Sequence, residues 1–349
     1  MSMRREPLSR QEVVDAIERR GCRGIPAYMH KFWGMGLEEK YGEKLTELAS
    51  KYPDDICDVF YTEPGYDVSP NGNPEYRFGF KDYSNDAERH GLESTVVLIE
   101  DWDELDEFLE HFPDPWEEGN FDVVYEAAAK AEGRYKLGCF WRVFHERFWA
   151  IRGMENLMYD YYDAMDELKI LGKRLVEFYK VIIDRFADAG FDGIFTSDDL
   201  GTQQSSMMSP AVFEELYLPL YKEVIDYVHE KGMHFWLHSC GNNTVLMEYL
   251  IEAGVDVFHP VQKGCMDEQE TMDNFGDRIT FLAGIDVQHL LPNGTTEEIK
   301  EEIRWLKRVY NPEGKGMLLG MGNGILTDSS LENIEAALDA IFEDYEPVK

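Results

Sequence analysis

The chain has 349 residues, of which hydrophobic residues make up 44% and aromatic residues 13%. This much apolar side chain is enough for a large core and excludes a wholly disordered protein. Its 69 acidic residues against 34 lysines and arginines give a formal net charge of −35 at pH 7. Because so acidic a surface repels phosphate backbones and anionic lipid, we expect no nucleic-acid partner and no membrane binding.

The cysteines and the apolar runs indicate where the protein works. Its five cysteines are odd in number and widely spaced, which fits reducing conditions better than a disulfide framework. The first residues, MSMRREPLSRQEVV, lack the apolar segment of a signal peptide, and no apolar run approaches the roughly 18 residues that span a bilayer. We expect a soluble cytoplasmic protein, with a homodimer as one option for its assembly.

Taken in chain order, the first half of the sequence is irregular. The stretch EPGYDVSPNGNPEYRFGF is rich in Gly, Pro and Asn, which favours a loop or hairpin. We interpret residues 28–132 as a divergent N-terminal lid or insertion. Helices are expected at 9–20, 102–111, 120–131 and 168–189, and strands at 55–61, 95–99 and 135–140.

The second half alternates apolar, strand-like runs with helical segments. The helix predicted at 210–231 begins with Ser-Pro, an N-cap followed by proline at the first helical position. Capping boxes at 295–298 and 329–332 predict the starts of two further helices. The strands are expected at 191–197, 233–239, 255–261, 278–284 and 316–322.

Repeated strand–helix units predict an α/β fold with a parallel sheet. With eight strand candidates, we expect a single (β/α)₈ TIM barrel, in which residues 133–349 form the most regular portion. The alternative is an open doubly wound sheet. No GxGxxG or P-loop motif follows any predicted strand, which disfavours nucleotide-binding versions of that alternative.

Polar residues gather where the predicted strands end. In a (β/α)₈ barrel the reacting groups lie at the carboxyl ends of the strands, so these side chains are candidates for an active site. Each also fits a structural role, such as closing a turn, capping a helix or adopting a left-handed backbone. The candidates are Asp198, Asp199, His238, Cys240, His259, Gln262, Asp286 and Asn323.

The stretch FWLHSCGNN places His238 and Cys240 two residues apart. Alternation along a strand points both side chains to the same face, and an imidazole with a thiolate makes half of a tetrahedral zinc site. Zinc normally takes three ligands from the protein, so such a pair alone is more often a buried strand end than a metal site.

Aromatic residues are concentrated in YMHKFWGMG, which contains Trp33, and in CFWRVFHERFW, which contains Trp141. They fit an ordinary core. At a barrel mouth they would instead line an apolar pocket for an organic ligand.

Three segments together resemble the uroporphyrinogen decarboxylase superfamily, and the resemblance covers about residues 139–345. They are DDLGTQQSSMMSPAVFEELYLPLYKEVIDYVHEKGMHFWLHSCGNNTVLMEYLIEAGVDVFHPVQ, FGDRITFLAGIDVQHLL and GNGILTDSSLENIEAAL. The resemblance implies a (β/α)₈ barrel. The haem-pathway decarboxylases of this superfamily carry an arginine-rich motif after the first strand, whereas IPAYMHKFWGMGLEEKYG has no arginine. A substrate with many carboxylates is therefore disfavoured.

The other branch that the sequence resembles consists of cobalamin-dependent methyltransferases, which move a methyl group between a small compound and a corrinoid protein. That resemblance implies a Zn²⁺ site with His238 and Cys240 as ligands. Its third ligand is a cysteine, where this sequence has Asn323. The site could still close with Asp198, Asp199, Asp286 or Cys265, and such an oxygen-rich shell suits an ether or phenolate oxygen better than a thiol.

We therefore predict a methyltransferase that O-demethylates a small methoxylated compound, with an aromatic compound as one option and a corrinoid protein as its partner. Alternatives are a decarboxylase of another carboxylated substrate and a non-catalytic barrel that binds a corrinoid or small ligand. The expected roles are metal ligation by His238 and Cys240, catalysis by Asp198, Asp199 and Asp286, and substrate binding by Gln262, Asn323, Trp33 and Trp141.

Overall fold

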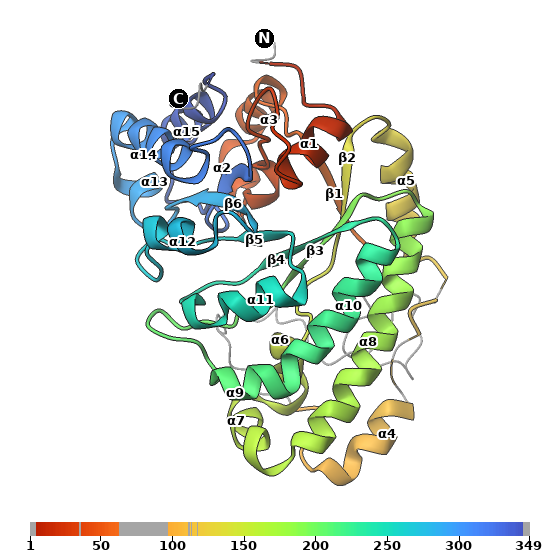
Figure 1. The fold of residues 1–349 in the computed structure, drawn as a ribbon. Coiled ribbons are helices and arrows are strands. Elements are labelled where there is room, and N and C mark those ends of the chain that lie inside the picture. The colour runs from red at the N-terminus through yellow and green to blue at the C-terminus, as the bar shows by residue number, and fades with distance from the viewer. Residues whose placement is uncertain are drawn as a thin grey trace.

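The computed structural model describes residues 5–34, 36–62, 97–110, 112, 114–116 and 118–344. In this part of the chain, parallel strands form one seven-stranded sheet, and each strand pairs with the next along the sequence (Figure 1). The strands are β1 (Ile56–Phe60), β2 (Tyr135–Cys139), β3 (Gly193–Ser197), β4 (His234–His238), β5 (Val257–His259), β6 (Thr280–Ile285) and β7 (Met317–Met321).

The two edges of this sheet meet through a short stretch near the N-terminus. Ala27 forms a parallel bridge with Leu319 of β7, and the N–H of Tyr28 donates to the carbonyl of Leu319 at 2.9 Å. On the other side, the N–H of Asp55, just before β1, donates to the carbonyl of Ala27 at 2.9 Å. This stretch stands in the place of an eighth strand, and the arrangement is consistent with a TIM-like barrel.

The predicted strand at 95–99 is wrong in the part that the structure describes. Residues 97–99 lie outside the sheet, where the N–H groups of Leu98 and Ile99 both donate to the carbonyl of Ile151. Packing against another segment has overridden the strand propensity of these apolar residues. Residues 95–96 and the predicted loop or hairpin at 63–80 lie outside the described residues, and the lid at 28–132 remains a prediction.

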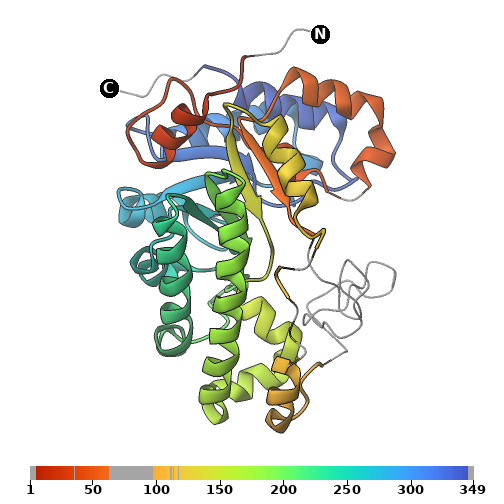
Figure 2. The same cartoon turned by 90° about the vertical axis from the view of Figure 1, so that its right-hand side faces the viewer.

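Helices cover the outside of the sheet, and two long ones, α8 and α10, run side by side (Figures 1 and 2). The capping box at Thr295 is confirmed, whereas the next helix is capped by Ser330, which accepts from the N–H of Asn333. The helices are α1 (Arg10–Ile17), η1 (His30–Phe32), α2 (Leu37–Tyr41), α3 (Glu43–Lys51), η2 (Trp102–Glu104), α4 (Leu105–Glu110), α5 (Asp122–Lys130), α6 (His145–Arg152), α7 (Met154–Asp163), α8 (Met165–Asp188), α9 (Pro210–Val212), η3 (Phe213–Tyr217), α10 (Leu218–Glu230), η4 (Thr244–Leu246), α11 (Met247–Ala253), α12 (Glu268–Phe275), α13 (Leu290–Asn293), α14 (Thr296–Tyr310) and α15 (Leu331–Ile341).

Aromatic rings fill the middle of the sheet. Tyr28, Phe195 and Trp236 are fully buried, and their ring centroids lie 6.0 to 6.3 Å apart. This packing fills the interior below the carboxyl ends of the strands, where a (β/α)₈ barrel has its core. None of the described helices combines the length and the apolar character that a bilayer crossing demands.

A buried carboxylate secures the closure of the sheet. Asp55 is fully buried, accepts hydrogen bonds from the N–H groups of Leu8 and Ala27, each at 2.7 Å, and pairs with Arg5. Burial raises the pKa of Asp55, while Arg5 and the two N–H groups oppose that rise. One side chain therefore ties the N-terminal segment, the bridging stretch and β1 together.

We expect Asp55→Asn to lower the free energy of unfolding by about 2–4 kcal/mol, because it removes the charge that compensates Arg5 within the fold. Urea denaturation followed by circular dichroism measures this change. The matched control is Asp163→Asn, at an exposed position on α7. Equal stability of the two variants would contradict the anchoring role of Asp55.

Candidate active site

The carboxyl ends of β3, β4 and β5 lie level with one another. Ser197 pairs with His238, and His238 pairs with His259. This register brings three potential metal ligands together, because Asp199, His238 and Cys240 each offer one ligand atom and these atoms lie within 4.8 Å of one another. His238 Nε2 is 3.3 Å from Cys240 Sγ and 3.7 Å from Asp199 Oδ1.

Two glycines let the loops after β3 and β4 approach closely enough to bring Asp199 and Cys240 into one cluster. A Cβ on Gly241 would lie 2.2 Å from the carbonyl oxygen of Gly201, and a Cβ on Gly201 would lie 2.6 Å from the nitrogen of Asn242. Gly241 also has φ +84°, a left-handed backbone that other residues rarely adopt. Any larger residue at either position would push Asp199 and Cys240 apart.

Hydrogen bonds hold the same loops in place. The N–H of Cys240 donates to Asp199 Oδ1 at 2.8 Å, and the N–H of Gly241 donates to Gln262 Oε1 at 2.7 Å. Gln262, expected to bind substrate, therefore uses its carbonyl oxygen to fasten the loop that carries Cys240.

A chain of hydrogen bonds determines which nitrogen of His238 faces the cluster. His259 Nε2 lies 2.8 Å from the carbonyl of Met321, which can only accept, so this nitrogen carries the proton. His259 Nδ1 then accepts from His238 Nδ1, 2.8 Å away. Burial lowers the pKa of both imidazoles, which keeps them neutral. His238 Nε2 therefore carries no proton and turns its lone pair toward Cys240 and Asp199, in the form that binds a metal ion.

This donor set fits Zn²⁺. Three protein ligands with one open position are typical of catalytic zinc, and the nitrogen, sulfur and oxygen atoms here match its preferences. Burial raises the pKa of the Cys240 thiol, so a metal ion would have to displace its proton. Asn323 Nδ2 donates to Cys240 Sγ at 3.4 Å. Asn323 thus contacts the sulfur as a donor and adds no fourth ligand through this nitrogen.

The cluster opens onto a cavity of about 330 Å³, within the range of small-molecule sites. Residues at or after the carboxyl ends of β2, β3, β4 and β7 line it, together with residues in and just after η1. They are Lys31, Phe32, Gly34, Trp141, Glu146, Ser197, Asp199, His238, Asn323 and Gly324.

Glu146 is a site residue that the sequence reasoning missed. It lines this cavity although it is only 8% exposed, and the Ser197 hydroxyl donates to Glu146 Oε2 at 2.5 Å. Burial, together with the nearby charges of Asp199 and Asp198, raises the pKa of Glu146 to about 8. Glu146 therefore keeps its proton at pH 7 and can act as an acid. An acid within the aromatic-rich stretch CFWRVFHERFW was the available signal.

The adjacent acids Asp198 and Asp199 lie in different surroundings and have different roles. Asp198 is fully buried, and its oxygens accept from the N–H groups of His145 and Glu146 and from the Tyr221 hydroxyl, at 2.6 to 2.9 Å. Burial raises the pKa of Asp198 to about 6. Asp198 caps the start of α6 and so positions Glu146, while Asp199 joins the metal-ligand cluster.

The remaining residues predicted for the site are Asp286, Trp33 and Trp141. Asp286 accepts from the N–H groups of Gln288 and His289 and shares a small cavity of about 40 Å³ with Cys240. Trp33 packs on His30 at 4.6 Å between ring centroids and does not line the larger cavity, whereas Trp141 does.

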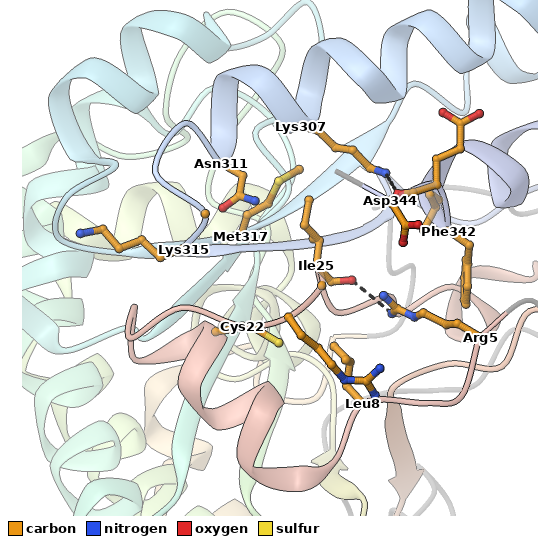
Figure 3. A pocket seen from close by; sticks show the side chains of 16 residues that line it. Arg5, Leu8, Cys22, Ile25, Lys307, Asn311, Lys315, Met317, Phe342 and Asp344 are labelled. Carbon is orange, nitrogen blue, oxygen red and sulfur yellow. Dashed lines mark hydrogen bonds between the residues drawn. The ribbon is translucent and has the colours of Figure 1, made fainter. Parts of the chain in front are cut away.

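A cavity of about 380 Å³ lies at the opposite side of the sheet, where β7 begins (Figure 3). Both described ends of the chain, Arg5 and Asp344, line it. Its cationic side chains already have partners within the protein. These are Arg5 with Asp55, Arg23 with Glu12, Lys315 with Glu313, and Lys307 with the carbonyls of Ala340 and Glu343. This cavity is therefore a poor candidate for the active site.

Comparison with known proteins agrees with the fold. Residues 141–343 match the family described as uroporphyrinogen decarboxylase (URO-D), and the chain belongs to this family. A methylated-thiol–coenzyme M methyltransferase of Methanosarcina mazei is 26% identical over 144 residues, which cover 40% of this chain and 35% of that protein. The chain thus spans about a third of the length of this curated relative. A solved methyltransferase from Methanosarcina mazei shares the fold with a TM-score of 0.65 at 16% identity, covering 96% of this chain and 98% of that one.

We expect His259→Phe to weaken zinc binding about 10- to 100-fold, because the hydrogen bond that orients His238 is lost while a ring of similar size remains. Competition with a chromophoric chelator measures the affinity. His229→Phe, beside the amino end of β4, serves as the matched control. Unchanged affinity in His259→Phe would show that His238 needs no such partner.

Proposed function

We propose that this protein O-demethylates a small methoxylated aromatic compound and transfers the methyl group to a corrinoid protein. The observation that carries the proposal is the cluster of Asp199, His238 and Cys240 on a cavity of about 330 Å³ with an aromatic wall. Membership of the URO-D family and similarity to a curated methyltransferase support it.

Asp199, His238 and Cys240 would hold the Zn²⁺ ion, which supplies Lewis acidity toward an oxygen atom of the substrate. With one thiolate and one carboxylate, this set is harder than one with two thiolates, and it favours an oxygen over a sulfur ligand. The corrinoid of the partner protein supplies the cobalt nucleophile that accepts the methyl group.

The residues of this chain orient the methyl donor and donate a proton to the oxygen atom that loses the methyl group. Trp141 offers a flat apolar face, and its ring centroid lies 6.1 Å from that of His238, so an aromatic ring stacked there lies beside the cluster. When the bond between methyl carbon and oxygen breaks, the electron pair stays on oxygen. Glu146, neutral at pH 7, then gives its proton to that oxygen. Ser197 and Asp198 hold Glu146 in place.

The test mixes the purified protein with zinc, a Co(I)-corrinoid protein and a panel of methoxybenzenes, and follows the absorbance change that accompanies methylation of the corrinoid. We expect methylation with at least one methoxybenzene and none with His238→Ala, while His229→Ala keeps the activity. Release of CO₂ from a carboxylated compound, with no corrinoid methylation by any donor, would favour a decarboxylase instead.

We expect Glu146→Gln to slow methyl transfer about 10²-fold or more, because the amide keeps the shape of the side chain but cannot supply the proton. A proton donor works only while it is protonated, so the wild-type rate should fall as the pH rises through the pKa of Glu146. A bound cation favours the carboxylate, which places this fall at or below about pH 8.

Rates measured from pH 5 to 9 check this expectation. Glu146→Gln should lose the fall at high pH and should bind as much zinc as the wild type. Glu155→Gln, at an exposed position on α7, is the matched control. A variant Glu146→Gln with the wild-type rate and pH profile would exclude the role of Glu146 as an acid.

A further inference from the structure

Lys31 is a cation at the wall of the active-site cavity that the reaction proposed above does not use. It belongs to η1, directly after the stretch that closes the sheet, and it lines the cavity together with Trp141 and His238. It is the one cationic side chain among the described residues that line this cavity. The chain has a formal charge of −35, so the question is what holds a cation at the wall of this cavity and what it could bind.

Two aromatic rings hold the ammonium group. Lys31 Nζ lies 3.6 Å from the ring centroid of Phe60 and 4.6 Å from that of Trp141. Both distances are those of cation–π contacts, which hold a lysine head group in place without an oxygen acceptor. Phe60 is the last residue of β1 and Trp141 follows β2, so neighbouring strands position both rings.

The hydrogen-bond donors of this ammonium are unused. Among the described residues, Lys31 makes neither a hydrogen bond nor an ion pair within 4.0 Å, although it is only partly exposed. Burial lowers the pKa of Lys31, and the charges of Cys139 and Asp58 oppose this. A partly buried ammonium with free donors is costly unless an anion completes it.

The position of Trp141 connects this cation to the metal-ligand cluster. Lys31 Nζ lies 4.6 Å from the ring centroid of Trp141, and the ring centroid of His238 lies 6.1 Å from it. Because all three residues line the same cavity, a flat molecule bound beside Trp141 would lie within reach of both Lys31 and His238. The cavity of about 330 Å³ has room for one substituted benzene ring.

We propose that Lys31 binds a carboxylate on the ring of the methyl donor, so that the substrate class is a methoxylated aromatic acid with its two substituents at opposite ends. This inference names the substrate of the function proposed above and rests on it. The carboxylate takes the free N–H donors of Lys31, and the methoxy group lies beside Asp199, His238 and Cys240.

Binding of benzoate tests the proposal without any methyl transfer, because benzoate carries no methyl group. Isothermal titration calorimetry compares benzoate with neutral benzyl alcohol in the wild type, in Lys31→Met, in Lys31→Arg and in Lys130→Met. Lys130 lies on α5, and its side chain is 79% exposed, so Lys130→Met changes the net charge equally at a remote position.

We expect Lys31→Met to weaken benzoate binding about 10- to 100-fold, the scale of a lost charge-assisted hydrogen bond. Binding of benzyl alcohol should stay unchanged, which also shows that the cavity is intact. Lys31→Arg and Lys130→Met should bind benzoate like the wild type. Equal benzoate affinity in Lys31→Met, or no benzoate binding by the wild type, would overturn the proposal.

Methyl transfer separates this inference from the function on which it rests. With 4-methoxybenzoate, Lys31→Met should raise KM by the same factor while kcat changes little, and 4-methoxybenzyl alcohol should react equally with both proteins. If benzoate binding depends on Lys31 but no methoxy compound methylates the corrinoid, the proposed function fails while the anion site at Lys31 stands.

Discussion

The level alignment of β3, β4 and β5 at their carboxyl ends is the constraint on which the rest of the site depends. A shift of one residue in a strand moves every side chain to the opposite face. Because Ser197 is level with His238, and His238 with His259, the imidazole reaches both Asp199 and its orienting partner. The backbone contact between Gly201 and Gly241 then fixes how closely the two loops approach.

Buried polar groups next to the site hold its side chains in fixed orientations. Both oxygens of Asp198 accept hydrogen bonds, from two N–H groups at the start of α6 and from the Tyr221 hydroxyl. The helix capped in this way carries Glu146, which lines the cavity. His259 donates a hydrogen bond to the backbone carbonyl of Met321 and accepts one from His238, so this carbonyl sets the orientation of both imidazoles. In both places a buried group acts through a neighbour, because a low dielectric makes each unsatisfied polar atom costly.

Local patterns in the sequence predicted much of the fold and part of the site. Strand alternation placed His238 and Cys240 on one face, and the structure brings them to the same cluster. The capping residues Thr295 and Ser330 begin their helices near where the sequence indicated. The position that resembles a third zinc ligand, Asn323, does lie beside Cys240, although as a hydrogen-bond donor. The helix α6 escaped prediction because all its residues are buried, and such a helix shows no polar face.

The sequence by itself determined the alternation of strands and helices, the family and the concentration of polar residues at strand ends, since these depend on spacing along the chain. Only the tertiary structure decided which of two adjacent acids serves the cluster, because neighbouring residues at a strand end point to opposite sides. It also brought Glu146 and Lys31 to the cavity, and it closed the sheet with residues 26–28, while residues 97–99 lie outside the sheet. These outcomes rest on contacts between segments far apart in sequence, and no local pattern encodes such contacts.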